Sequence, residues 1–123
     1  MSIEQDISTT FTNNATLNGL VSGRNYKGDI QQNPTLPYTF AQRINTLPVH
    51  NLSGSSQRIN THYQIDCYAA TLEDAWVLSR AVKVAMAAAT LFESVHLNSI
   101  DGNFDDDVEG YRVISDFSVW FVD

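Results

Sequence analysis

Hydrophobic and polar residues alternate along residues 57–69, and a helical repeat follows directly. The segment reads QRINTHYQIDCYA. Successive side chains of a strand point to opposite faces, so a period of two predicts a half-buried strand. The two sets of alternate positions are Ile59, Thr61, Tyr63, Ile65, Cys67 and Ala69 on the more apolar face, and Arg58, Asn60, His62, Gln64, Asp66 and Tyr68 on the polar face.

The next segment, residues 71–89, has the features of a capped amphipathic helix. Thr71 can act as the N-cap, because its hydroxyl can accept a hydrogen bond from the first turn. Asp74 stands three residues later, where its carboxylate can reach back to the backbone N–H of the cap. Apolar residues then recur at helical spacing, which predicts one buried face. They are Ala75, Leu78, Val82, Ala85, Met86 and Ala89.

The beginning of the chain predicts one short helix followed by a loop. The polar stretch from Thr12 to Asn18 is expected to fray from the end of this helix. Residues 19–37 contain three Gly and two Pro, which is typical of a loop, with a short extended piece near Tyr26. The residues that would form the apolar face of the helix are Ile3, Ile7, Phe11 and Leu17.

Three further segments have the pattern of strands. Tyr38–Asn45 alternates, and the polar segment Pro48–Ser56 is expected to be a long hairpin loop that leads into the strand of residues 57–69. Another strand is expected around Ser94–Asn98, and a last one over Tyr111–Val122. Both faces of the last strand are apolar, and such strands are usually covered twice. The main helix would supply one cover and another subunit the second.

These elements predict an α+β fold with a single domain over residues 1–123. We expect an antiparallel sheet of about four strands, with one main helix and a short N-terminal helix packed on one face. A chain of this length can bury about two-thirds of its unfolded surface, enough for one core. The expected core residues are Tyr38, Phe40, Ile65, Leu78, Val82, Val113 and Phe117.

Three blocks of sequence, in this order and at these intervals, carry a resemblance to a known family. They are LPYTFAQRI over Leu36–Ile44, QIDCYAATLEDAWVLSRAV over Gln64–Val82, and YRVISDFSVWF over Tyr111–Phe121. The chain resembles the tail-completion, or tail-terminator, proteins that join head and tail in long-tailed bacteriophages. In that family a strand ending in an "IDCYA" type sequence is followed by Thr and an acidic, Ala-rich helix.

The resemblance implies a structural virion protein with the same architecture. Such a protein would form a homo-oligomeric ring, expected to be a hexamer, at the head-proximal end of the tail. The ring would stop polymerisation of the tail tube protein and dock to the head connector or head-completion protein, while DNA passes through without specific binding. A ring of this kind needs two different edges on each subunit that close after a fixed rotation. The family offers no catalytic residue.

The charge of the chain limits the classes of partner. Its net charge is −7, which disfavours free binding to nucleic acid and to anionic membranes, because both need Lys and Arg. No apolar run approaches the ~20 residues that span a bilayer, and MSIEQDIST lacks the basic and apolar regions of a signal peptide. We therefore expect assembly in the cytoplasm of the bacterial host and no membrane partner. Cys67 is the only cysteine and is expected to be a buried thiol.

The acidic segment DGNFDDDVEG begins like a calcium-binding loop but does not continue as one. Asp106 stands where such a loop requires Gly, and Arg112 stands where it requires a bidentate Glu. A solvated acidic loop is the expected structure. The oxygen-bearing residues at alternate positions are Asp101, Asn103, Asp105, Asp107 and Glu109.

The sequence predicts neither an enzyme nor a metal or cofactor site. His50, His62 and His96 are far apart, and no paired His or Cys spacing typical of zinc occurs. The chain has no G-x-S-x-G turn for a hydrolase and no glycine-rich phosphate loop.

Contact residues can only be suggested from residue type and charge. Trp76 lies beside the main apolar stripe of its helix, where it could be a contact anchor or could widen the core. Basic residues before position 60 and acids after position 100 suit head-to-tail contacts, although two ordinary solvated faces would give the same pattern. The suggested interface residues are Arg43, Arg58, Asp66, Trp76, Asp105, Asp106 and Asp107.

Two other functions remain open at this point. One is a head-completion or neck adaptor protein, which is also a ring former and would stay on the head when tails are absent. The other is a small soluble module that binds a ligand or peptide on an open sheet face. A chain that stays monomeric and never joins a particle would favour the second.

Overall fold

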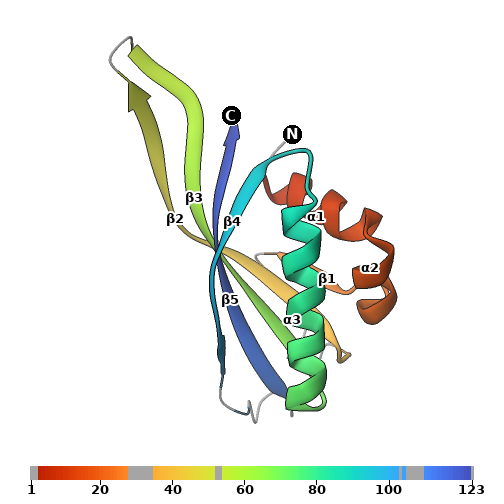
Figure 1. Ribbon diagram of the computed structural model, residues 1–123. Helices are drawn as coiled ribbons and strands as arrows, with labels where there is room; N and C mark the ends of the chain where they lie inside the picture. Colours follow the sequence, from red (N-terminus) through yellow and green to blue (C-terminus); the bar gives the residue numbers. More distant parts are fainter. Residues whose placement is uncertain (1–2, 28–34, 52–53, 103, 105–109, 123) are drawn as a thin grey trace.

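A computed structural model describes residues 3–27, 35–51, 54–102, 104 and 110–122 of the chain (Figure 1). Helices and strands occur along it in runs, which is typical of an α+β fold. The helices are α1 (Ile3–Asn13), α2 (Ala15–Val21) and α3 (Leu72–Ala87), and the strands are β1 (Asn25–Lys27), β2 (Tyr38–Asn51), β3 (Gly54–Ala69), β4 (Glu93–Asp101) and β5 (Tyr111–Val122).

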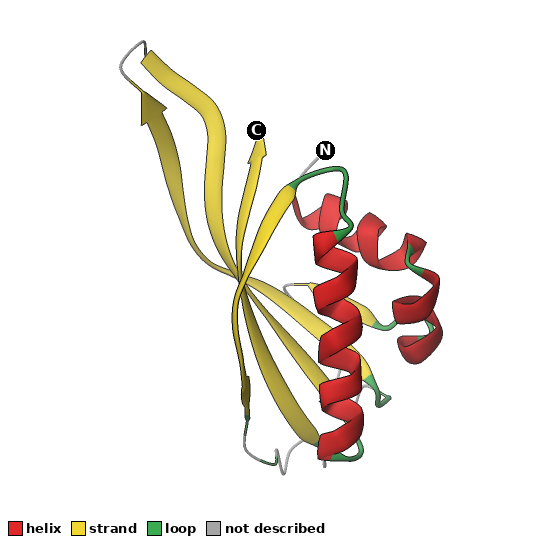
Figure 2. Cartoon of the chain, viewed as in Figure 1, coloured by secondary structure: helices red, strands yellow, loops and turns green. Residues whose placement is uncertain are grey.

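The strands form one sheet in the order β1-β2-β3-β5-β4. All described helices lie on one face of this sheet, and the other face has no helix on it (Figure 2). The α+β class and the layer of helices on one face are confirmed. The number of strands differs, because the short strand β1 adds a fifth and pairs parallel to β2 through Asn25 and Thr39. Three residues are too few to show a periodic pattern, so the sequence suggested only an extended piece there.

The N-terminal segment forms two helices where one fraying helix was expected. Asn14 interrupts the first helix and caps the second: its side-chain oxygen accepts a hydrogen bond from the backbone N–H of Leu17 at 2.9 Å. Asn is among the best N-cap residues, so the polar stretch restarts a helix instead of ending one. Helix α2 ends at Ser22 and Gly23, whose φ angles are 52° and 80°.

The segment Pro48–Ser56 was predicted as a loop and is mostly strand. Strands β2 and β3 pair as far as Asn51 and Gly54, and register shifts occur between Arg43 and Asn45 and between Pro48 and His50. A shift beside Pro48 is reasonable, because proline has no N–H to give to a ladder and is found at bulges and edges. We call residues 45–51 of β2 and 54–58 of β3 the arm. In Figure 1 the arm extends away from the helices beyond the rest of the sheet.

The main helix and its strand agree with the sequence. The Thr71 hydroxyl accepts a hydrogen bond from the backbone N–H of Asp74 at 3.1 Å, which confirms the cap. The apolar set of β3 faces the helices and the polar set faces away, as predicted. The buried side chains between the helices and the sheet include Ile7, Phe11, Leu17, Tyr63, Ile65, Leu78, Val82, Met86, Phe117 and Val119.

Two expected core residues of β2 lie on the other face of the sheet. Ala41 is the residue of β2 that joins the core, whereas Tyr38 and Phe40 share a face with Tyr68 and Asp66, their partners in register. Tyr38 is buried there by stacking on Tyr68, with ring centroids 4.7 Å apart, and Phe40 is only half-buried. Tyr38 is therefore buried as expected, although outside the cluster under the helices, and the expectation was wrong only for Phe40. The other five expected core residues are buried.

Within the described residues, no helix is long and apolar enough to cross a membrane.

Candidate interaction surfaces

Arg43, a suggested interface residue, is held by contacts inside the subunit. Its guanidinium donates hydrogen bonds to Glu4 of α1, 2.9 Å from Oε1 and 3.1 Å from Oε2. The same group lies 6.0 Å from the ring centroid of Tyr63 and 5.9 Å from that of Phe121. These contacts attach the N-terminal helix to the sheet, although Arg43 and Glu4 are both partly open to solvent.

Asp66 is almost completely buried, with 3% of its surface exposed, although it lies on the face without helices. Gln64 donates a hydrogen bond to its Oδ1 at 3.1 Å, and Nη1 of Arg112 is 3.9 Å from its Oδ2. Burial raises the pKa of the Asp66 carboxyl, while the hydrogen bond from Gln64 and the charge of Arg112 oppose that rise. Most of this residue is therefore engaged within the subunit.

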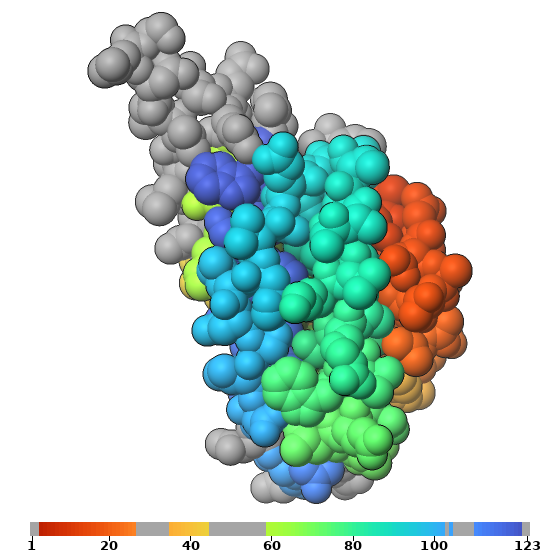
Figure 3. Space-filling model, viewed as in Figure 1, coloured from red at the N-terminus to blue at the C-terminus, as the bar shows by residue number. Residues whose placement is uncertain are grey.

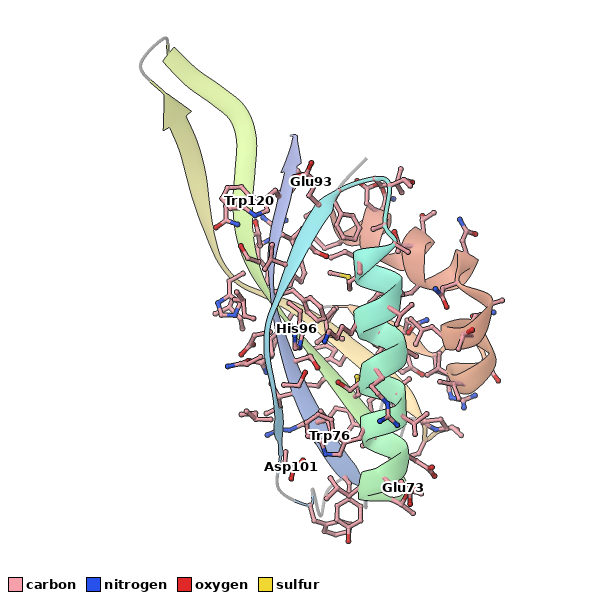
Figure 4. The ribbon with its side chains drawn as sticks, viewed as in Figure 1. Glu73, Trp76, Glu93, His96, Asp101 and Trp120 are labelled. Atoms are coloured by element: carbon pink, nitrogen blue, oxygen red, sulfur yellow. The ribbon has the colours of Figure 1, made fainter. Side chains whose placement is uncertain are left out.

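Trp76 is half-buried. It lies against a small buried cluster of Ala69, Ala75 and Val113, and its indole N–H donates a hydrogen bond to Asp101 Oδ1 at the end of β4. Figure 4 shows Trp76 and Asp101 side by side at the lower end of the sheet. Of the two interpretations of Trp76, this packing favours the widened core.

The remaining suggested contacts cannot be located by their side chains. The backbone of Arg58 belongs to β3 and pairs with Val122, but its side chain lies outside the described part of the structure. Asp105, Asp106 and Asp107 lie outside the described residues altogether, as does most of the acidic segment. Among the described residues, no group of three or more His, Cys, Asp or Glu side chains could hold a metal ion.

Strand β4 shows a feature that sequence reasoning missed: four of its polar residues face the helices. His96 is in register with the buried core residue Phe117, so it shares the helix-covered face. Val95 is in register with Ser118 on the opposite face. The alternation in ESVHLNSID is visible in the sequence, but only the register with β5 shows which set faces the core. The helix-facing residues of β4 are Ser94, His96, Ser99 and Asp101.

The helix-facing polar groups of β4 are connected by hydrogen bonds. His96 Nε2 is 2.8 Å from Ser99 Oγ, and Ser99 Oγ is 3.0 Å from Oγ of the buried Ser115 on β5. Ser115 Oγ is in turn 2.8 Å from Oγ of Ser79, which is buried on α3. Buried hydroxyls need such partners, because an unsatisfied one costs free energy on burial. The network fixes the orientation of β4.

The outward side of β4 exposes aliphatic side chains. Val95 is 55% exposed, Leu97 52% and Ile100 51%. Leu97 lies at a register shift between His96 and Asn98, whereas Val95 and Ile100 lie on the helix-free face. The half-buried Ile114 and Trp120 of β5 lie on this face too, opposite Ile100 and Glu93. We call these five apolar residues the β4 face.

The space-filling view shows β4 beside α3, along one side of the molecule (Figure 3). Strand β4 pairs with β5 and stands at one end of the strand order, while β2 and the short β1 stand at the other end. An edge strand with exposed aliphatic residues is a site where another chain can pack. The described structure thus offers two different surfaces, the β4 face and the arm.

Comparisons with known proteins agree with this architecture. The model of a family described as "Tail completion protein gp17" matches residues 5–122. A solved chain from the virion of a native gene transfer agent particle has a similar structure, with a TM-score of 0.73, 14% sequence identity, and coverage of 99% of this chain and 96% of that one. At this identity the likeness shows the fold alone. No curated protein sequence matches the chain. Because the family match spans nearly the whole sequence, the chain belongs to the phage tail completion protein gp17 family and is a structural tail protein of the virion.

Proposed function

We propose that the chain is a ring-forming tail terminator, which caps the tail tube and joins it to the head connector. The family match over residues 5–122 is the observation that carries this proposal. The fold supports it, because the arm, at the ends of β2 and β3, and the β4 face are different surfaces of one sheet. Contacts between two unlike surfaces close into a ring when the rotation between subunits is right. A hexamer is the ring size that the family resemblance implies.

In this role the protein acts through its surfaces and not through catalysis. Its partners would be copies of itself, the tail tube protein below the ring and the head connector or head-completion protein above it, at the head-proximal end of the tail. Assembly would take place in the host cytoplasm. With a net charge of −7 the subunit offers DNA few cationic contacts, so the genome could pass through the ring without being held.

The suggested interface residues now differ in how well they suit ring contacts. Arg43, Asp66 and Trp76 each have partners inside the subunit. Arg58 and the acidic residues Asp105–Asp107 remain predicted contacts with neighbouring subunits or neighbouring rings.

Electron microscopy of particles made without this gene tests the proposal. Overlong or unattached tails beside full, tailless heads are the expected result. Tails of normal length beside leaking or empty heads would instead make the protein a head-completion component. Wholly normal virions would contradict both roles and favour a soluble binding module. Re-expression of the chain in the same cells is the control, and it should restore joined particles.

A further inference from the structure

We propose that the β4 face of one subunit is covered by the arm of the next subunit in the ring. This inference rests on the proposed function, since it names the contact through which the ring would close. The partner that would cover the β4 face is a second copy of this chain.

The first step is that the β4 face cannot be buried within its own subunit. A shift of one residue would turn Val95 toward the helices, but it would also turn His96 and Ser99 away from them. That shift would break the hydrogen bonds from His96 through Ser99 to the buried Ser115 and Ser79. The aliphatic side of β4 is therefore held outward by the polar network on its other side.

The second step is that the backbone of the arm continues beyond the pairing of β3 with β5. Pairing between β3 and β5 ends at Arg58 and Val122, so the strands continue beyond this point as a two-stranded hairpin. A two-stranded hairpin is at best marginally stable in water without a surface to pack on. A neighbouring subunit would supply that surface. The arm sequence includes Leu47 and Val49, which are suited to an apolar contact.

The third step is geometric. Strand β2, which carries one side of the arm, is separated from β4 by β3 and β5 in the order β1-β2-β3-β5-β4. A contact between them joins unlike surfaces, leaves the arm of one copy and the β4 face of another free, and can be repeated around a ring. A contact between two β4 faces would instead give a closed pair and no ring.

The fourth step is charge complementarity. No Asp or Glu occurs between Asp29 and Asp66, so the arm contains Arg58 and His50 but no acid. The helix-free face beside β4 contains Glu93, which is exposed, and Asp116. His62, 3.4 Å from Asp116, and Arg112, 3.9 Å from Asp66, are basic groups on the same face among the residues with described side chains. Opposite charge steers and orients association more than it strengthens it.

A photo-crosslinking experiment can test this contact directly. Trypsin cleaves after Arg43 and Arg58 and finds no Lys or Arg between them, so the arm leaves the digest as one peptide, residues 44–58. We would replace Val95 by p-benzoylphenylalanine in the full-length chain and irradiate assembled particles. The matched control carries the same probe at Val84, which is 63% exposed on α3. Mixed isotopic labelling of the copies shows whether a crosslink joins two subunits.

The expected result is a crosslink between position 95 of one copy and peptide 44–58 of another, with none of this kind from position 84. In addition, Val95→Asp should reduce the yield of joined particles about tenfold or more, as expected for loss of a central apolar contact. Val84→Asp should not reduce it, and circular dichroism should show both variants folded.

Other outcomes separate this inference from the proposed function. Crosslinks from position 95 to another segment of the chain, or to a tube or head protein, would overturn the inference while a ring at the tail end still supports tail termination. Full yield of joined particles from Val95→Asp would also overturn it. Particles with no ring of this protein at the tail end would overturn the inference and the proposed function together.

Discussion

The buried hydroxyls of Ser79 and Ser115 show how a single residue constrains this fold. Both are on the core side of the sheet and almost fully buried. Their 2.8 Å contact joins α3 to β5, and the contact from Ser115 to Ser99 continues to β4. A polar pair in a core is tolerated because each member satisfies the other.

Removing one hydroxyl of this pair should lower the free energy of unfolding more than removing both. Ser115→Ala leaves the Ser79 hydroxyl without this partner, and we expect a loss of about 1–3 kcal/mol in the free energy of unfolding. The double variant Ser79→Ala/Ser115→Ala should recover part of the loss, since neither hydroxyl is then buried alone. Urea unfolding of the two single variants and the double variant measures the coupling. Additive losses would show that the two hydroxyls act independently.

His96 gives the stability of the protein a predictable pH dependence. Burial and the charge of Lys83 lower its pKa, while Asn98 and Asp116 oppose the shift. The folded state therefore takes up a proton on this ring less readily than the unfolded state. The contribution of His96 is complete above the unfolded pKa and is lost as the pH falls through the folded pKa.

We expect the free energy of unfolding to decrease between about pH 7 and pH 5.5, and to decrease less in His96→Gln. Chemical denaturation at a series of pH values, for the parent chain and the variant, is the measurement. The raised pKa of Asp66 has the opposite sign and acts at lower pH, so Asp66→Asn is a useful control. Identical pH profiles for the parent and His96→Gln would contradict the assignment.

At the scale of elements, the N-cap of α3 is the feature that the sequence predicted most directly. Thr71→Ala removes the acceptor for the Asp74 N–H, and a loss of about 1 kcal/mol in the free energy of unfolding is expected. Thr71→Ser keeps a hydroxyl and should stay close to the parent. Thermal or urea unfolding distinguishes the two. A Thr71→Ala chain as stable as the parent would mean that water replaces the cap without cost.

Two glycines should respond in opposite ways to an added methyl group. A Cβ at Gly102, just after β4, would lie 2.9 Å from the backbone oxygen of Arg112, so Gly102→Ala should destabilise the protein by about 1–3 kcal/mol. A Cβ at Gly19, within α2, would meet nothing within 4 Å, and Gly19→Ala should stabilise it by up to about 1 kcal/mol because alanine favours helix. Unfolding curves for the pair check both signs.

The elements that the sequence predicted well are those with one buried and one polar face. Strand β3 and helix α3 have such patterns, so both their type and their buried side could be predicted. Helix α2 was missed because its start depends on the side chain of Asn14 and not on periodicity. The strand character of Pro48–Ser56 was missed because pairing between β2 and β3 holds those residues extended, and a polar sequence gives no sign of it.

The interaction surfaces could not be predicted from the sequence, because the sequence does not give the register between β4 and β5. The sequence showed that Val95 and Leu97 alternate with Ser94 and His96, but pairing with β5 decides which set faces the core. The same lack of register affected Phe40 on β2. Residue type alone suggested Arg43, Asp66 and Trp76 as contacts, and the structure shows each with partners inside its own subunit.

At the scale of the whole molecule, helices cover one face of the sheet and leave the other without a helix (Figure 2). The two edge strands, the short β1 and the longer β4, differ from each other. The helices complete the core on one side, which leaves the other side and the arm available for assembly. Family membership establishes that this is a structural tail protein. The ring, its size and its neighbours are proposals that the deletion and crosslinking experiments can decide separately.

The register shift between His96 and Asn98 bears on aggregation of the subunit through its edge strand. A straight, hydrophobic edge strand is a template to which further strands can add without limit, and amyloid fibrils grow in this way. The register shift in the middle of β4 interrupts the regular row of backbone groups that such strand addition requires. Strand β4 can therefore expose aliphatic side chains without presenting an unbroken edge to other chains.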